Sequence, residues 1–138
     1  MKLYYAGPLF TNAEREWNIR LARALEAAGH EVFLPQTQEP GKTAAAIFRT
    51  DVEAIDWADA LVAVMDGSDP DSGTAWECGY AYGKKPVILL RTDFRAWSME
   101  GASTYNPMLT ESATIALELP YAAMDEVVDA VLGALSRI

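Results

Sequence analysis

An acidic residue near the start of an expected helix is the strongest chemical signal in the sequence. Glu77 lies in the segment 66–80, which follows the apolar run 60–65 and is rich in Asp, Ser and Gly. A turn of this kind places the next helix at the carboxyl edge of a parallel sheet, where α/β proteins bind ligands. We expect Glu77 in the first turn, where backbone N–H groups and the helix dipole favour an ionised, nucleophilic carboxylate. Such a carboxylate can attack an anomeric carbon, and the resulting glycosyl ester can be opened by an acceptor with retention.

A purely structural role for Glu77 is the alternative. The spacing of Thr74 and Glu77 matches a capping box, in which the Glu side chain accepts a hydrogen bond from the backbone N–H of the cap residue. Both interpretations place the residue at the same end of the helix. A Gln at this position would preserve the box but could not form an ester, so a Glu77→Gln variant separates the two roles.

The elements that must position Glu77 are predicted from the hydrophobic pattern. Strand-like and helix-like segments alternate about five times, and unbroken apolar runs are typical of strands buried on both faces. The pattern predicts an α/β fold, a doubly wound, flavodoxin- or Rossmann-like five-stranded parallel sheet with helices on both faces. The expected strands are 3–6, 32–34, 60–65, 87–90 and 114–119, and the expected helices are 12–28, 43–57, 73–82 and 120–137, the last with Pro120 near its start. Residues 91–113 are expected to form a long loop with room for a helical turn.

Composition narrows the function. The chain has 138 residues, half of them apolar, and we expect one domain over 1–138. A net charge of −9 argues against nucleic acid as a partner. The sequence has no long apolar run and no leader, which favours a cytoplasmic protein without a membrane partner. With a single His and a single Cys, and no glycine-rich phosphate loop, we expect neither a metal nor a cofactor.

The sequence resembles the nucleoside 2-deoxyribosyltransferase family. The resemblance covers most of the chain in one order, through four segments: Leu3-Tyr4-Tyr5-Ala6-Gly7-Pro8-Leu9-Phe10; Asp51-Val-Glu-Ala-Ile-Asp-Trp-Ala-Asp-Ala-Leu-Val-Ala-Val; Asp71-Ser-Gly-Thr-Ala-Trp-Glu77-Cys-Gly-Tyr-Ala; and Asn106-Pro-Met108. The third segment is the most similar, in residue order and in spacing.

The resemblance implies three catalytic roles. Glu77 is implied as the nucleophile on C1′ of the deoxyribose, and Tyr4 as the group that holds its carboxylate. Tyr5 is the alternative, although adjacent strand residues point to opposite faces; either Tyr could instead be a core aromatic. Asp51 is implied as the acid that protonates the leaving base, and its alternative is a solvated helix carboxylate. To donate a proton near neutral pH, Asp51 needs a raised pKa.

Further residues are implied in substrate binding. Asp71 is expected near the sugar, where a carboxylate repels a 5′-phosphate and accepts a hydrogen bond from a free 5′-hydroxyl. Its alternative is a turn residue, and Ser68, Ser72 and Arg91 could still form an anion site. Gly7, in the turn after the first strand, is expected beside the substrate. Gln38 is expected to contact the base, with Gln36 as the alternative.

Two residues near the carboxyl end imply an oligomer. Asn106 and Met108 resemble residues that the family supplies to the site of a neighbouring subunit, so we expect a homo-oligomer. The alternative is an Asn-Pro turn followed by a packed Met.

The leading hypothesis is therefore a nucleoside 2-deoxyribosyltransferase of nucleotide salvage, whose partners are a 2-deoxynucleoside and a free purine or pyrimidine base. One alternative is an N-glycosidase that hydrolyses a deoxynucleoside or its 5′-monophosphate. A non-catalytic nucleoside- or nucleotide-binding module is the other, because a fold does not guarantee an activity.

Overall fold

The computed structural model describes residues 1–38, 41–95 and 104–138. Its sheet has five parallel strands in the order β2-β1-β3-β4-β5. The strands are β1 Lys2–Ala6, β2 Glu31–Phe33, β3 Ala60–Val64, β4 Val87–Arg91 and β5 Ile115–Glu118. The helices are α1 Asn12–Ala27, α2 Ala44–Trp57, α3 Ser72–Ala81, α4 Pro107–Thr110 and α5 Met124–Leu135, with a short 3-10 helix, η1, at Pro35–Thr37. The predicted doubly wound α/β fold is confirmed.

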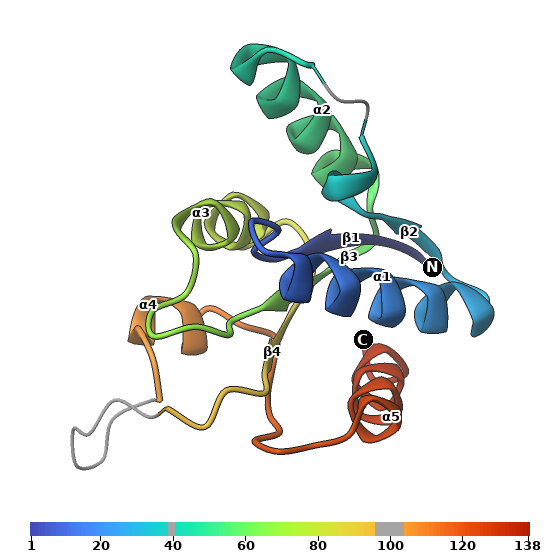
Figure 1. Ribbon diagram of the computed structural model, residues 1–138, viewed down its shortest axis with the longest axis vertical. Helices are drawn as coiled ribbons and strands as arrows, with labels where there is room; N and C mark the ends of the chain where they lie inside the picture. Colours follow the sequence, from blue (N-terminus) through green and yellow to red (C-terminus); the bar gives the residue numbers. More distant parts are fainter. Residues whose placement is uncertain (39–40, 96–103) are drawn as a thin grey trace.

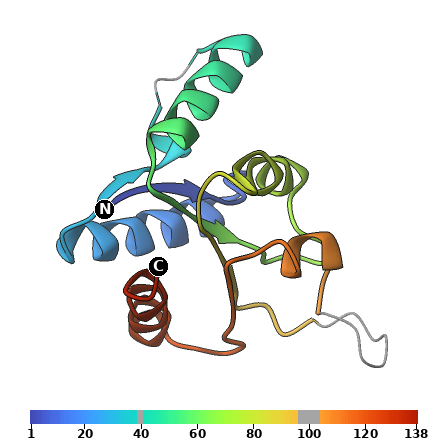
Figure 2. The same cartoon turned by 180° about the vertical axis from the view of Figure 1, so that it is seen from behind.

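Helices cover both faces of the sheet (Figure 1). Helices α1 and α5 lie side by side on one face, and α2 and α3 lie on the other, as the reverse view also shows (Figure 2). The chain goes from β1 to β2 in one direction and from β3 to β5 in the other, so the strand order reverses between β1 and β3. Ligands of such sheets bind outside the carboxyl ends of the strands at this point.

The two neighbouring tyrosines of β1 are buried on opposite faces. Tyr4 packs with the α2 and α3 side of the sheet, and Tyr5 packs with the α1 and α5 side. This follows from the alternation of side chains along a strand. Only Tyr4 can therefore serve a site under α2 and α3.

Helix α2 is only partly packed against the protein. Its carboxyl half is anchored by Ala54 and Ile55, whereas its amino half extends past the sheet (Figure 1), where Ile47 and Phe48 are about half exposed. Thr43 caps the helix by accepting a hydrogen bond from the backbone N–H of Ala46. The projecting half, with Ile47 and Phe48, lines a cavity that α3 also lines.

Two helix starts differ from the sequence prediction. Helix α3 begins at Ser72, so Glu77 lies in its second turn and not in its first. Helix α5 begins at Met124 and not near Pro120, because the Glu126 carboxylate accepts a hydrogen bond from the backbone N–H of Ala123 and fixes the start there. The expected loop 91–113 includes residues 96–103, which lie outside the described residues, and α4 lies in its last part. None of the helices in the described ranges is long and apolar enough to span a membrane.

Candidate active site

Glu77 and Tyr4 are in direct contact at the α3 side of the sheet. The Tyr4 hydroxyl donates a hydrogen bond of 2.6 Å to Oε1 of Glu77, although 73 positions separate the residues in sequence. Tyr4 is fully buried in β1, where its ring stacks on Phe33 of β2. Packing thus holds the tyrosine in place, and its hydroxyl fixes one oxygen of the carboxylate, while no hydrogen bond from another described side chain reaches the second oxygen.

The surroundings of Glu77 favour its protonated form. Burial raises its pKa to about 7, the nearby charges of Asp51 and Asp71 act in the same direction, and the Tyr4 hydrogen bond opposes them. The expectation that backbone N–H groups at the helix start keep this carboxylate ionised is therefore wrong. The reason is its place in the second turn, beyond the free N–H groups of the first.

Asp71 is the N-cap of α3. Its Oδ2 accepts hydrogen bonds from the backbone N–H of Thr74, at 2.9 Å, and from the Thr74 hydroxyl, at 3.1 Å. The Thr74–Glu77 capping box does not form, because the cap lies three residues earlier and Thr74 is inside the helix. The cap also holds the Asp71 charge close enough to Glu77 to raise the pKa of Glu77.

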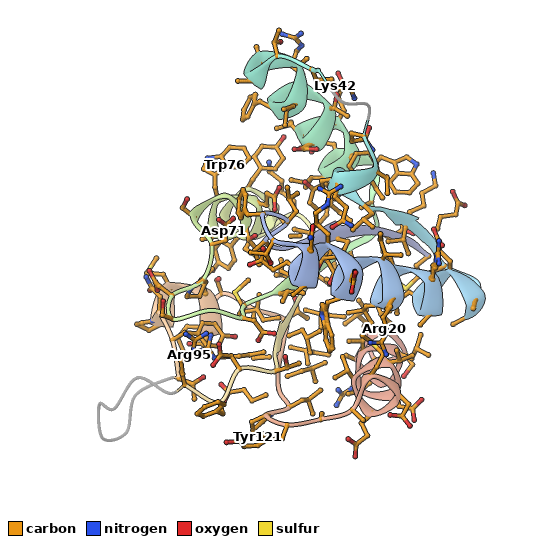
Figure 3. All side chains as sticks on the ribbon, viewed as in Figure 1. Arg20, Lys42, Asp71, Trp76, Arg95 and Tyr121 are labelled. Atoms are coloured by element: carbon orange, nitrogen blue, oxygen red, sulfur yellow. The ribbon has the colours of Figure 1, made fainter. Side chains whose placement is uncertain are left out.

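Asp51 and Glu77 line the same cavity between α2 and α3. This cavity, of about 520 Å³, has apolar walls that include Phe48 of α2 and Trp76 of α3. The two rings are tilted against each other with their centres 5.4 Å apart, and Trp76 projects from α3 toward α2 (Figure 3). Asp51 is half-buried, and burial raises its pKa, while Lys42 acts in the opposite direction. Asp51 is therefore not a simple solvated helix carboxylate.

A second, more polar cavity adjoins the first at Ile47 and Asp51. It measures about 260 Å³ and is lined by Leu9, Arg15, Pro35, Gln36, Gln38, Gly41, Lys42, Ile47, Thr50 and Asp51. The Lys42 ammonium donates to Oε1 of Gln38 at 3.3 Å. Asp51 thus lies between an apolar cavity that contains Glu77 and a polar cavity that contains Gln38.

Gln36 has a structural role that distinguishes it from Gln38. Its Oε1 accepts a hydrogen bond from Nδ2 of Asn18, and its Nε2 donates to the backbone oxygen of Arg15, so both ends of the amide are engaged. Asn18 is buried, and it also accepts from the Tyr5 hydroxyl and donates to the backbone oxygen of Pro8. This network joins the segments that follow β1 and β2.

Gly7 allows close packing of the turn after β1. A Cβ at this position would lie 3.3 Å from Cβ of Val64 and 3.4 Å from the Tyr5 ring. The lack of a side chain therefore lets the turn lie against β3. Its expected contact with substrate stays a prediction.

Asn106 and Met108 are not brought together with Glu77 within one chain. Asn106 caps α4 by accepting from the backbone N–H of Met108 at 3.0 Å, and Met108 is 79% exposed, so it is not a packed core residue. Both line a groove of about 630 Å³ between α3 and α4, with Ala75 and Gly79 on the α3 side. The helical spacing of Ala75 and Gly79 places this groove on a different face of α3 from Glu77.

Arg91 does not contribute to an anion site. It is 3% exposed, and its guanidinium donates to the backbone oxygens of Met65, Gly67 and Arg95. The cation is thus directed into the loop that follows β3, where these three hydrogen bonds hold it within the protein.

Three residues at the two cavities were missed in the sequence. Phe48 lies three positions before Asp51 on the same face of α2, and Trp76 directly precedes Glu77. Lys42 precedes the cap of α2 and reaches Gln38. Helical spacing from Asp51 could have indicated Phe48, but neither spacing nor composition relates Lys42 to Gln38.

The fold and the site together define a class of protein. A tyrosine-supported carboxylate and a second, half-buried carboxylate line one cavity at the switch point of a flavodoxin-like sheet, an arrangement that can perform covalent chemistry on a glycosidic bond. Residues 3–117 match the family described as Nucleoside 2-deoxyribosyltransferase. The chain belongs to this family, whose members are enzymes that act on nucleosides and nucleobases.

Solved structures agree with this assignment. A 2-deoxyribosyltransferase from Bacillus psychrosaccharolyticus is 27% identical, with a TM-score of 0.72 and coverage of 94% of this chain and 91% of that chain. A 2-desoxiribosyltransferase from Leishmania mexicana is 25% identical, with a TM-score of 0.68 and coverage of 83% and 89%. The CMP N-glycosidase BcmB from Clostridium botulinum shares the fold at 20% identity, with a TM-score of 0.67 and coverage of 97% and 99%. A search of curated protein sequences found no match.

Proposed function

We propose that this protein is a nucleoside 2-deoxyribosyltransferase that moves 2-deoxyribose between bases through a covalent ester on Glu77. The observation that carries the proposal is the 2.6 Å hydrogen bond from Tyr4 to Glu77 in a cavity that Asp51 also lines. A nucleophile and a proton donor are both needed to cleave an N-glycosidic bond, and this cavity offers one carboxylate for each task.

In the first half-reaction, the free oxygen of Glu77 bonds to C1′ as the bond from C1′ to the base breaks. Asp51, whose protonated form is favoured by burial, donates its proton to a ring nitrogen of the leaving base. Tyr4 keeps its hydrogen bond to the other Glu77 oxygen, which orients the carboxylate toward the sugar.

The second half-reaction is the reverse with another base. A ring nitrogen of the acceptor bonds to C1′, its proton passes to Asp51, and Glu77 leaves as a carboxylate. Two displacements at the same carbon retain its configuration. In this scheme the donor base and the acceptor base use the same pocket in turn.

Asp71 favours a nucleoside over a nucleoside monophosphate as the substrate. Its carboxylate is held at the start of α3 near Glu77 and would repel a 5′-phosphate, whereas it can accept a hydrogen bond from a 5′-hydroxyl. The engagement of Arg91 with backbone oxygens removes one cation that could have offset this repulsion.

The test is chromatography of protein incubated with deoxyinosine, with and without free adenine or cytosine. We expect a new deoxynucleoside that depends on the acceptor and is lost in Glu77→Gln by a factor of about 10³ or more, as for other nucleophiles. Glu16→Gln, on the exposed face of α1, is the matched control and should keep full activity.

Other outcomes would contradict the proposal. Base release at an equal rate without acceptor would identify a hydrolase, and deoxyinosine 5′-monophosphate should be tested in the same assay. Binding without turnover of either compound would identify a binding module. Full activity of folded Glu77→Gln would exclude the covalent mechanism.

A further inference from the structure

The polar cavity beside Asp51 contains an arrangement that can select among bases. Its central contact is the one between the Lys42 ammonium and Oε1 of Gln38, at 3.3 Å. An ammonium group can only donate hydrogen bonds, so the carbonyl end of the Gln38 amide faces Lys42 and the NH₂ end faces away. Lys42 lies at the amino end of α2 (Figure 3), close enough for its charge to oppose the burial that raises the pKa of Asp51.

This contact changes what Gln38 can recognise. A free Gln can read adenine by donating to N7 and accepting from the 6-amino group, whereas Lys reads the two acceptors N7 and O6 of a 6-oxopurine. With its carbonyl oxygen turned to Lys42, Gln38 offers its amide hydrogens instead. Lys42 and Gln38 thus act together as a group of donors.

The other described residues that line the polar cavity also favour hydrogen-bond donors. Gln36 is less suited to base recognition, because its Oε1 accepts from Asn18 and its Nε2 donates to the Arg15 backbone oxygen within the protein. Among the described residues that line the polar cavity, Asp51 is the sole carboxylate, and protonated Asp51 is itself a donor. A 6-oxopurine presents N7 and O6 as adjacent acceptors, which matches these donors. A 6-aminopurine would direct its N–H groups at a cation.

We propose that the Lys42–Gln38 pair makes 6-oxopurines, hypoxanthine and guanine, the preferred bases of this protein. The inference rests on the proposed function, since it assumes that the base lies against Asp51. Asp51 then donates to N7 while Lys42 donates to O6. Because one pocket serves the donor and the acceptor, the same preference applies to the deoxynucleoside that is cleaved and to the base that is accepted.

The experiment compares hypoxanthine with adenine, both as acceptors of deoxyribose from deoxycytidine and as free ligands in titration calorimetry. We expect a kcat/KM and an affinity about tenfold or more higher for hypoxanthine. In Lys42→Met this preference should fall by about tenfold, because Gln38 becomes free to accept from the 6-amino group. Arg20→Met, which removes an exposed cation of α1 (Figure 3), should leave the ratio unchanged.

The outcomes separate this inference from the proposed function. Equal transfer to both bases, or an unchanged ratio in Lys42→Met, would overturn the inference while the transferase stands. Tighter binding of hypoxanthine that depends on Lys42, without transfer to any base, would support the recognition pair and overturn the transferase. Tighter binding of adenine by the wild-type protein would exclude the proposed recognition directly.

Discussion

At the residue scale, the proposed chemistry depends on how two carboxylates share one cavity. Burial raises the pKa of Glu77 to about 7, and the charges of Asp51 and Asp71 add to this effect. The Glu77 carboxylate must nevertheless be ionised to act as the nucleophile. The hydrogen bond that Tyr4 donates to it favours this charged form. The balance between these effects sets the pH at which the free enzyme becomes active.

Tyr4→Phe should move that pH upward. A hydrogen bond to a charged group contributes about 1.5–3 kcal/mol, so its loss should raise the pKa of Glu77 by about one to two units. Because only the ionised carboxylate reacts, kcat/KM rises with pH through the Glu77 pKa. We therefore expect about tenfold lower kcat/KM at pH 7 in a pH–rate profile, with recovery at higher pH as far as Asp51 keeps the proton that it donates.

Tyr5→Phe is the matched control for this profile. The Tyr5 hydroxyl lies on the other face of the sheet and donates to Asn18. The acid limb of the pH–rate profile of Tyr5→Phe should therefore stay near that of the wild type. An unmoved acid limb in Tyr4→Phe would show that Tyr4 does not tune Glu77.

At the element scale, the end of β4 secures the loop that leads to α3. Arg91 is the last residue of β4, and its buried guanidinium donates to the backbone oxygens of Met65 and Gly67 just after β3. It also lies over the ring of Tyr105, which directly precedes Asn106, at 5.3 Å from the ring centre. One side chain thus contacts the loop before Asp71 and the segment that begins α4.

Arg91→Met should therefore weaken both the fold and the site. Buried carbonyl groups that lose a donor cost about 1–3 kcal/mol each, so we expect a loss of about 2 kcal/mol or more in the free energy of unfolding, measured by urea denaturation. Transfer activity should fall as well, because the loop that positions Asp71 is less constrained. Arg137→Met, which removes an exposed donor to the Gly133 oxygen of α5, should change stability by less than about 0.5 kcal/mol.

At the scale of the whole molecule, the cavity and the groove on two faces of α3 suggest how the active site is completed. The cavity with Glu77 is open on one face of the helix, and the groove with Asn106 and exposed Met108 lies on another. If Asn106 acts in the site of a neighbouring subunit, as the family resemblance implies, each active site needs two chains.

Mixing two inactive variants tests this shared site. Glu77→Gln and Asn106→Ala should each lose activity, and after joint refolding of equal amounts about a quarter of the wild-type activity should return, since half of the pairs are mixed and each carries one intact site. Light scattering should show more than one chain per particle. No recovery in mixed oligomers would place Asn106 and Glu77 in the same chain's site.

The alternation of strands and helices could be predicted from the sequence, because buried parallel strands are continuous apolar runs and need no partner to be identified. Element boundaries were less accurate where capping residues compete. Asp71, Ser72 and Thr74 are all acceptable N-caps, and Asp71 takes this role, which moves Glu77 into the second turn.

The sequence by itself determined the fold class, which follows from local periodicity, and the family resemblance, which implies the candidate pair of Glu77 and Asp51. Only the tertiary structure decided that Tyr4 and not Tyr5 donates a hydrogen bond to Glu77, that burial raises the pKa of Glu77 to about 7, and that Lys42 faces Gln38. The physical reason is that a side chain's partners and its desolvation depend on segments far apart in the chain, and these distances are set only when the sheet and its helices pack.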